Sequence, residues 1–253
     1  MCTSKSTGKC TSYSTCKIFS LILAILFISF SSAFAEVSPD FVSKYEKGVV
    51  HIKTFDKQGR LTGSGSGFFI NQDGALITNH HVLHTSYEAT AETVDGKKYR
   101  IKRIVSYKAE YDLVVAEVEK NEAINYYLEL APANPQKGEQ IVVFGNPQGF
   151  RFVATSGEIS AIQNFPSEEF KSLPYKGTFL QFSAPISPRS SGGPILNMKG
   201  QVVGVTTWGW TKGQNLNFAT TVEAIHDLLR NGEKSSLIKE GNECYALILS
   251  DGT

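Results

Sequence analysis

Ser191 is the residue of this sequence whose neighbours best suit a catalytic nucleophile. It lies in the run Ser187-Pro-Arg-Ser-Ser-Gly-Gly-Pro194, which is followed by an apolar segment, a Lys199-Gly200 turn and a second apolar segment. Glycines beside a serine let the main chain turn sharply, so that backbone N–H groups can face a developing oxyanion. Ser-Gly-Gly also occurs in ordinary turns, so the assignment depends on a base and an acid elsewhere in the chain.

A base for this serine should be a histidine at the end of a strand that faces a cleft. His80 and His81 end the segment Leu76-Ile-Thr-Asn-His-His-Val82 and meet that requirement. His51 lies inside a predicted strand and His226 on a predicted helix, so we expect both to be ordinary surface or packed side chains. The sequence therefore places the candidate base at residue 80 or 81.

The acid should be a carboxylate held among apolar residues, where it can keep an imidazole in one tautomer and stabilise its charged form. Asp112 is the one aspartate that enters an apolar strand, Leu113–Val118. Its alternative role is that of a turn residue at a strand start. The remaining aspartates considered lie beside turn glycines, where a structural role is favoured; they are Asp56, Asp73 and Asp95.

The chain order of the three candidates discriminates between folds. An α/β-hydrolase requires the order Ser, Asp, His, but no aspartate lies between Ser191 and His226. Arg189 also breaks the Gly-x-Ser-x-Gly elbow of those enzymes. The order His, Asp, Ser is that of the chymotrypsin-like double barrel.

The elements that must position these residues are short strands in two series. The first series is rich in β-branched and aromatic residues and is separated by turn signals; it comprises Val49–Phe55, Leu61–Ile70, Ala75–Thr78, Tyr87–Val94, Lys98–Ile104 and Leu113–Val118. The second comprises Gln140–Phe144, Phe152–Ile162, Thr178–Ala184, Pro194–Asn197, Gln201–Trp208 and Leu216–Thr220. Strands at this spacing favour barrels or sandwiches over a βαβ fold.

Two helices and a boundary complete the predicted organisation. Phe41–Lys47 and Val222–Arg230 have helical patterns, the first with Ser38 or Asp40 as its cap. The connection Glu119–Gly138 contains two prolines and separates the two series. The protease-like domain would then be 36–230, with halves at about 48–120 and 136–221, and residues 231–253 have no assigned role.

The first 35 residues have the composition of a secretory signal peptide. Three lysines and no acid precede the 13-residue apolar core Ile18–Phe30, and Ala33-Phe-Ala35 offers a cleavage site. The core is shorter than the roughly 20 residues of a spanning helix, so no stable membrane anchor is expected after cleavage. The protein is expected to be exported, to the periplasm or beyond the cell.

Cleavage after Ala35 also changes the charge and the cysteine count. The remaining 253 − 35 = 218 residues keep 25 − 3 = 22 basic and 24 acidic side chains, a net charge of −2. Without a basic excess, nucleic-acid binding is not expected. Cys2, Cys10 and Cys16 leave with the leader, so Cys244 alone remains and no internal disulfide is possible.

Several segments together resemble the successive motifs of the HtrA/Deg branch of the trypsin-like serine proteases. The matching segments run in order and span most of the chain from Val49 to Arg230; they are Gly63–Ile70, Leu76–Val82, Tyr111–Leu113, Gly145–Gly149, Thr155–Ser160, Ser190–Pro194 and Leu216–Thr220. The resemblance implies two six-stranded antiparallel β-barrels with the active site between them. It also implies an endopeptidase that acts on polypeptides and needs no cofactor.

The resemblance assigns a role to each candidate residue. It makes His81 the base, with His80 in the variable position of the motif, Asp112 the orienting acid and Ser191 the nucleophile. The backbone N–H groups of Arg189 and Ser191 would form the oxyanion hole. Substrate would pair with Thr207-Trp208-Gly209, and the first specificity pocket, expected to prefer apolar side chains, would be lined by Ile186, Trp208 and Phe218.

Two departures from the family pattern leave a second function open. Arg189 stands where the family usually has glycine, and residues after Asn231 are too few for the PDZ module that many relatives carry. A catalytically weak or inactive barrel pair that binds peptides is therefore the alternative to an enzyme. A homo-oligomer is possible without specific support, and a metal site at His80, His81 and His84 lacks a completing acid or cysteine.

Overall fold

The computed structural model describes residues 37–84, 86–147, 152–165, 175–209 and 216–234. The chain divides into two units, Met1–Glu36 and Val37–Thr253. The first unit contains the predicted signal peptide and lies outside the described residues, as does the end of the chain from residue 235. Among the described residues, no helix has both the length and the apolar character to cross a membrane.

The first barrel is built from the N-terminal strands. Its order is β5-β4-β1-β2-β3-β6, and it closes because β5 also pairs with β6. The strands are β1 (Val49–Phe55), β2 (Leu61–Phe69), β3 (Ala75–Asn79), β4 (Glu88–Thr93), β5 (Lys98–Lys108) and β6 (Leu113–Val118). All of these pairings are antiparallel.

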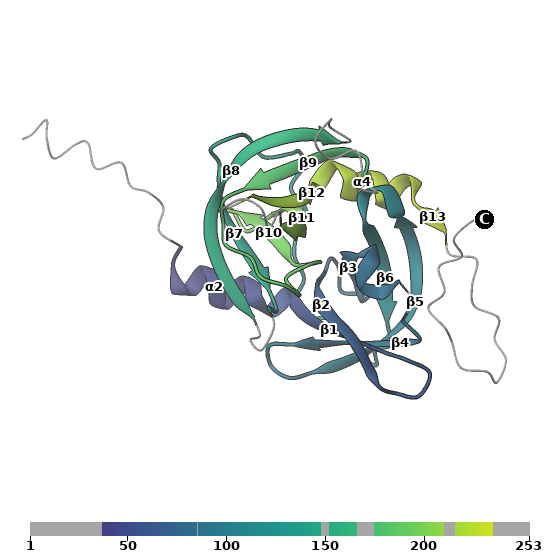
Figure 1. Ribbon diagram of the computed structural model, residues 1–253. Coiled ribbons are helices and arrows are strands. Elements are labelled where there is room, and N and C mark those ends of the chain that lie inside the picture. The colour runs from purple at the N-terminus through teal and green to yellow at the C-terminus, as the bar shows by residue number, and fades with distance from the viewer. Residues whose placement is uncertain (1–36, 85, 148–151, 166–174, 210–215, 235–253) are drawn as a thin grey trace, which may run out of the picture. The chain divides into compact units, whose positions relative to one another are not determined.

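The second barrel closes in the order β10-β11-β12-β9-β8-β7. Its strands are β7 (Gln140–Gly145), β8 (Val153–Phe165), β9 (Gly177–Phe182), β10 (Pro194–Asn197), β11 (Val202–Gly209) and β12 (Asn217–Thr221). In Figure 1, β7–β12 gather on one side of this unit and β1–β6 on the other. The predicted pair of six-stranded antiparallel barrels is confirmed.

Alternating side chains of the first-barrel strands pack into two different cores. Phe69 and Leu76 pack inside the first barrel, whereas their neighbours Phe68 and Ile77 join the apolar core of the second barrel. Successive side chains of a strand point to opposite faces, so a strand buried on both faces needs apolar residues at consecutive positions. This explains the unbroken apolar runs in β2, β3 and β6, and it packs the two barrels together.

Helices border the barrels at each end of the described chain. α2 (Pro39–Tyr45) is capped by the Ser38 hydroxyl, which accepts the Phe41 N–H at 3.1 Å, and leads into the 3₁₀ helix η1 (Glu46–Gly48). α4 (Val222–Asn231) contacts strands of both barrels. A short strand, β13 (Glu233–Lys234), then pairs with β5, so the segment without a predicted role begins by extending the first barrel's sheet.

Several predicted boundaries were wrong by a few residues. β5 continues to Lys108 instead of ending at Ile104, because its second half pairs with β6. β8 continues to Phe165 through pairing with β9, although Gln163 and Asn164 gave no strand signal. The expected strand end at residues 80–82 is a short helix, α3 (His80–Leu83). The 3₁₀ helix η2 (Ala109–Tyr111) was not predicted.

Candidate active site

His81 and Asp112 form the best-defined pair of the candidate site. His81 Nδ1 lies 2.6 Å from Asp112 Oδ2, and the His81 backbone N–H donates to Asp112 Oδ1 at 2.9 Å. An ionised carboxylate only accepts hydrogen bonds, so Nδ1 carries the proton and Nε2 is left as the basic nitrogen. Burial lowers the pKa of His81, but the hydrogen bond and the charge of Asp112 outweigh it and raise that pKa above its usual value.

The chain folds locally so that Asp112 faces α3. Asp112 follows η2 in the left-handed conformation, with φ 52°, and is 2% exposed. Aspartate tolerates this conformation better than most residues. Its carbonyl oxygen accepts from the His80 N–H at 3.0 Å and from Asn79 Nδ2 at 2.8 Å. These bonds join the start of α3 to the Asp112 turn and so orient the two side chains.

Tyr175, a residue that sequence reasoning missed, lies in a segment of the second barrel that contacts the Asp112 turn. It precedes β9, and the backbone N–H of the next residue, Lys176, donates to Glu110 O at 2.9 Å, beside the Asp112 turn. Burial and then the nearby Asp112 carboxylate raise the pKa of Tyr175, so the phenol stays protonated. No motif pointed to Tyr175, because the turn beside it belongs to the other barrel.

Ser191 and His81 line one cavity, of about 210 Å³. The Ser191 hydroxyl donates to the Thr207 carbonyl oxygen at 3.1 Å, and among the described residues no hydrogen bond joins it to His81. In structures without substrate, catalytic hydrogen bonds are often long or misaligned. The rest of the cavity wall consists of Thr54, Thr62, Gly63, Ser64, Val82, His84, Ser86 and Arg189.

Arg189 adopts the backbone conformation that the family's glycine would be expected to provide. The Ser190 N–H donates to the Ser187 carbonyl oxygen at 3.0 Å, and Arg189 has φ 78°. Pro188 in second place and positive φ in third place are the pattern of a type II turn, which normally has glycine there. A non-glycine residue in the left-handed region is strained by about 1–2 kcal/mol.

The proposed oxyanion donors have no competing acceptor. Within the described part of the chain, neither the Arg189 N–H nor the Ser191 N–H donates to another protein group. The adjacent amides do have partners, since Gly192 N–H donates to Thr206 O at 2.8 Å and Gly193 N–H to Ser190 O at 3.0 Å. The two amides expected to bind an oxyanion are therefore the ones available to a ligand.

A buried pair, Ser66 and Asn146, holds the nucleophile loop against the first barrel. Ser66 Oγ donates to Arg189 O at 3.2 Å, and the Ser66 N–H donates to Ser191 O at 2.8 Å. The Asn146 N–H donates to Ser66 Oγ at 2.8 Å, while Asn146 Nδ2 donates to Val50 O at 3.0 Å. Both residues lay inside the motifs described above, but nothing in the sequence indicated that they meet.

The residues expected to bind substrate fall into two groups. Ile186 and Gly209 are neighbours, because a Cβ added to Gly209 would lie 3.6 Å from Ile186 Cδ1. Trp208 and Phe218 instead stack on each other, with ring centroids 4.0 Å apart, and Phe218 is 2% exposed. The Thr207 hydroxyl donates to Val205 O of the same strand at 2.9 Å.

The histidines outside the His81–Asp112 pair have other surroundings. The His80 ring stacks on His84 and on Tyr107, and His226 Nε2 lies 2.8 Å from the Ala131 carbonyl oxygen. His51 is half-buried on β1. No cluster of three or more His, Cys, Asp or Glu side chains suited to a metal ion occurs among the described residues.

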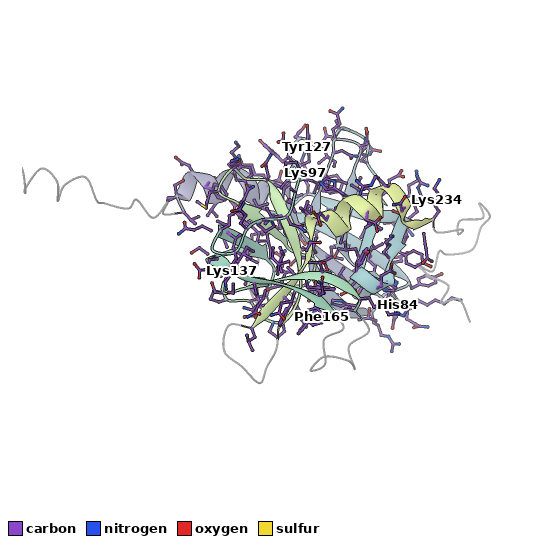
Figure 2. All side chains as sticks on the ribbon, turned by 90° about the horizontal axis from the view of Figure 1, so that it is seen from above. His84, Lys97, Tyr127, Lys137, Phe165 and Lys234 are labelled. Atoms are coloured by element: carbon purple, nitrogen blue, oxygen red, sulfur yellow. The ribbon has the colours of Figure 1, made fainter. Side chains whose placement is uncertain are left out.

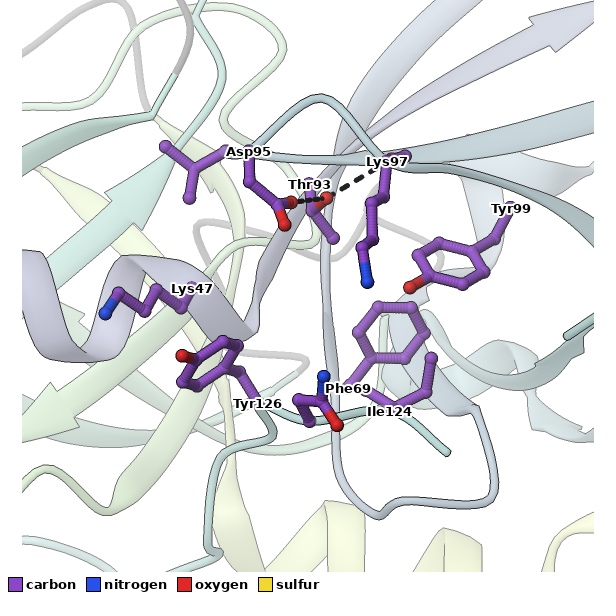
Figure 3. Close-up of a pocket in the computed structure, with 10 residues that line it drawn as sticks. Lys47, Phe69, Thr93, Asp95, Lys97, Tyr99, Ile124 and Tyr126 are labelled. Carbon is purple, nitrogen blue, oxygen red and sulfur yellow. Dashed lines mark hydrogen bonds between the residues drawn. The ribbon is translucent and has the colours of Figure 1, made fainter. Parts of the chain in front are cut away.

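A second cavity, of about 180 Å³, lies on the first barrel away from these residues. Figure 3 shows its wall, which includes Phe69, Tyr99 and Ile124, with Lys47 and Lys97 at its edge. In Figure 2, the labelled Lys97 lies on the opposite side of the two barrels from His84, which lines the His81–Ser191 cavity. None of the candidate catalytic residues lines this second cavity.

Comparisons with known proteins point to one family. The model of the trypsin-like peptidase domain matches residues 65–205. A probable periplasmic serine endoprotease DegP-like protein of Hahella chejuensis is 31% identical over 183 residues, 70% of this chain and 37% of its own length. The putative serine protease HhoB of Synechocystis sp. is 33% identical over 174 residues, 68% of this chain and 41% of its own length.

A solved structure agrees with these relatives. The Rv3671c protein of Mycobacterium tuberculosis H37Rv, a mutant crystallised in an inactive form, superposes with a TM-score of 0.67 and 25% identity. The match covers 80% of this chain and 95% of that one. The chain spans less than half the length of the two curated relatives named above.

Proposed function

Since this chain belongs to the trypsin-like peptidase family, a family of serine proteases, we propose that it is an exported endopeptidase with His81, Asp112 and Ser191 as its catalytic triad. The relatives named as a DegP-like serine endoprotease and a putative serine protease support this proposal. The single observation that carries it is the His81–Asp112 pair, 2.6 Å apart, on the wall of the cavity that Ser191 also lines.

In the proposed reaction, His81 acts first as a base and then as an acid. It takes the Ser191 hydroxyl proton while the serine oxygen attacks the peptide carbonyl carbon, and Asp112 stabilises the imidazolium that forms. The imidazolium then protonates the leaving amine as the C–N bond breaks, which leaves an acyl-enzyme. Water, deprotonated by His81, hydrolyses the ester and restores Ser191.

The Ser191 hydroxyl has to leave Thr207 O and turn toward His81 for this step. The oxyanion that forms would be bound by the N–H groups of Arg189 and Ser191, which have no other acceptor among the described residues. Preorganised donors of this kind contribute roughly 10²–10³ each in turnover. Arg189 in its left-handed conformation is compatible with this function.

An extended peptide would bind along β11. The pairing of β10 with β11 involves Val202–Val205, whereas the pairing of β12 with β11 continues to Gly209. The neighbouring strand on one side therefore ends before Thr207, and a substrate strand could add there. We expect a preference for an apolar residue before the cut, because Ile186 and Gly209 carry no charge; a peptide library would measure it.

Export rests on the predicted signal peptide at residues 1–35. The periplasmic designation of the Hahella chejuensis relative supports export to the same compartment. Secreting the full chain from a bacterial host and sequencing the N-terminus of the product tests this proposal. A mature protein that begins at Glu36 is the expected result, and a full-length protein retained in the cytoplasm would contradict it.

Digestion of casein by the mature protein, compared with Ser191→Ala, tests the proposed activity. The wild type should cleave casein and the variant should not. The second candidate function is a peptide-binding module, which is favoured by the strained Arg189 and by the Ser191 hydroxyl facing Thr207 O. Equal, tight binding of casein peptides by both proteins without cleavage would establish that alternative.

A further inference from the structure

We propose that the cavity beside Ser191 and His81 is a subsite for an acidic side chain in the part of the substrate that follows the cut, with Ser64 and Arg189 as its binding groups. This inference rests on the proposed function and deepens it, because it names a class of side chain that the site selects. It concerns the opposite side of the cut from the apolar preference described above.

The cavity lies on the side of the site where the leaving amine departs. Among the described residues, none of those expected to contact the peptide before the cut lines it; these are Ile186, Thr207, Trp208, Gly209 and Phe218. His81 does line it, and the imidazolium must protonate the amine that leaves. The peptide before the cut therefore pairs with β11, and the peptide after the cut enters this cavity.

Strand β2 brings Ser64 close to the nucleophile. The Ser66 N–H, two residues along the strand, donates to Ser191 O at 2.8 Å. A Cβ added to Gly65 would lie 3.2 Å from Ser191 O and 2.8 Å from Val82 Cγ1. The missing side chain of Gly65 thus lets β2 lie against both Ser191 and α3. Ser64 comes directly before this contact and lines the cavity.

The cavity wall offers hydroxyl donors that have no acceptor. Ser64 Oγ is buried, and it has no hydrogen-bond partner in the part of the chain that the structure describes. Leaving a buried hydroxyl unbonded costs free energy, which an oxygen of a bound ligand would recover. The hydroxyls of Thr54 and Thr62 share one hydrogen bond, at 3.2 Å, so one hydrogen of that pair also remains available.

Arg189 supplies a positive charge at the same wall. It is exposed, and its guanidinium forms no ion pair within the described ranges, where no Asp or Glu lines the cavity either. By contrast, Arg60, Arg100 and Arg103 each pair with an acidic side chain. A carboxylate only accepts hydrogen bonds, so it suits a guanidinium beside hydroxyl donors. A lysine or arginine of the substrate would meet a like charge here.

The acidic side chain belongs to the first or the second residue after the cut. Successive side chains of an extended peptide point to opposite faces, so one of these two points into the cavity. The cavity volume of about 210 Å³ far exceeds the roughly 10–15 Å³ that a single water needs, which leaves room for a side chain. The position that shows the preference identifies which residue enters.

The test compares peptides that are identical before the cut and carry glutamate or glutamine at the first or second position after it. We expect kcat/KM to be about tenfold higher for glutamate at one of these positions, as for one charge-assisted hydrogen bond. The advantage should shrink to less than about twofold in about 1 M salt, where the screening length is about 3 Å. Equal kcat/KM for glutamate and glutamine at both positions would overturn the proposal.

Variants of the cavity wall test which groups bind the carboxylate. Arg189→Gln should reduce the glutamate-to-glutamine ratio of kcat/KM to about twofold or less, and Ser64→Ala should reduce it about threefold. The ratio compares two substrates of one protein, so a general loss of turnover cancels. Arg103→Gln is the matched control, because Arg103 donates to Glu117 at 2.8 Å outside the cavity and its loss should leave the ratio unchanged. A wild-type ratio in Arg189→Gln would overturn the proposal.

Binding to Ser191→Ala separates this inference from the proposed function. Fluorescence anisotropy gives the Kd of the same peptides, labelled at the N-terminus, for a protein that cannot cleave them. Tighter binding of the glutamate peptide supports the subsite, and if the wild type cleaved no peptide, only the enzyme assignment would fall. Cleavage by the wild type with equal Kd and equal kcat/KM for glutamate and glutamine would overturn only the subsite.

Discussion

The acid turn around Asp112 and the nucleophile turn around Ser191 are each completed by the opposite barrel. From the second barrel, Thr220 Oγ1 donates to Tyr111 O and the Lys176 N–H donates to Glu110 O. From the first barrel, Ser66 donates to the carbonyl oxygens of Arg189 and Ser191. Asp112 is also bound within its own barrel, by His81 and by the Asn79 side chain. Docking of the two barrels therefore adds contacts to both turns, one from each side.

The two turns differ in how well their residues suit a left-handed backbone. Asp112 has φ 52° with its carbonyl and carboxylate bonded to neighbours, and aspartate accepts this conformation readily. Arg189 has φ 78° without that preference, and the Ser66 hydroxyl donates to its carbonyl oxygen. The acid turn is therefore a relaxed structure and the nucleophile turn a strained one.

The largest effect is expected from breaking the acid turn with Asp112→Asn. Asparagine tolerates the left-handed conformation, so the fold should persist, but its amide favours the wrong His81 tautomer. We expect kcat to fall by about 10⁴, as measured with a chromogenic peptide. A loss of less than tenfold in a folded variant would show that Asp112 is not the orienting acid.

The pH dependence of kcat/KM should depend on the acid turn and not on the nucleophile turn. His81 must be neutral to act as a base, and Asp112 raises its pKa above the ordinary value of 6.5. The value of kcat/KM should therefore fall tenfold per pH unit below a midpoint that lies above pH 6.5. Ser66→Ala, on the nucleophile side, should leave this midpoint in place. A wild-type midpoint below pH 6.5 would contradict the His81–Asp112 account.

Ser66→Ala should lower kcat less than Asp112→Asn does. It removes the hydroxyl that donates to Arg189 O in the nucleophile turn. Arg189 O and the buried Asn146 N–H lose their partner, which costs about 1–3 kcal/mol of unfolding free energy. We expect kcat to fall about tenfold. Ser183→Ala is the control, because Ser183 Oγ accepts the Glu158 N–H at 3.0 Å in the second barrel. Unchanged activity in Ser66→Ala would contradict the support role.

The smallest expected effect is a change in the free energy of unfolding when glycine replaces Arg189 or Asp112. Arg189→Gly should relieve about 1–2 kcal/mol of strain and lose about 0.5–1 kcal/mol to chain entropy, a net stabilisation below about 1.5 kcal/mol. Asp112→Gly should destabilise, because the bonds to His81 are lost. Urea unfolding measures both free energies. Destabilisation by Arg189→Gly would show that Arg189 is not strained.

The sequence predicted the strands best where strong turns bound them. The bounds of Pro194–Asn197 and Leu113–Val118 agree with the structure, because turn residues stop each strand. The prediction was wrong at the end of β8, where Gln163 pairs with Phe179 of β9. Pairing between strands therefore overrides the local preference of a polar segment.

The sequence predicted site residues only where a local motif surrounds them. Glycines, a strand end and chain order led to Ser191, to His80 or His81, and to Asp112. The family resemblance then selected His81, and the catalytic roles stay a prediction. Ser66 contacts Arg189 across 123 residues of sequence, and Thr220 contacts Tyr111 across 109. Such contacts leave no periodic or spacing signal. The sequence likewise identified Arg189 as unusual, but its positive φ required the structure.

Labelling with a fluorophosphonate probe tests the central claim most directly, because the probe reacts with an activated serine without needing a known substrate. Intact-mass and peptide analysis of the mature protein should show one adduct, on Ser191. The adduct should be absent from Ser191→Ala and form far more slowly in Asp112→Asn. Folded wild-type protein that remains unlabelled, or an adduct on a different residue, would contradict the triad proposed for this chain.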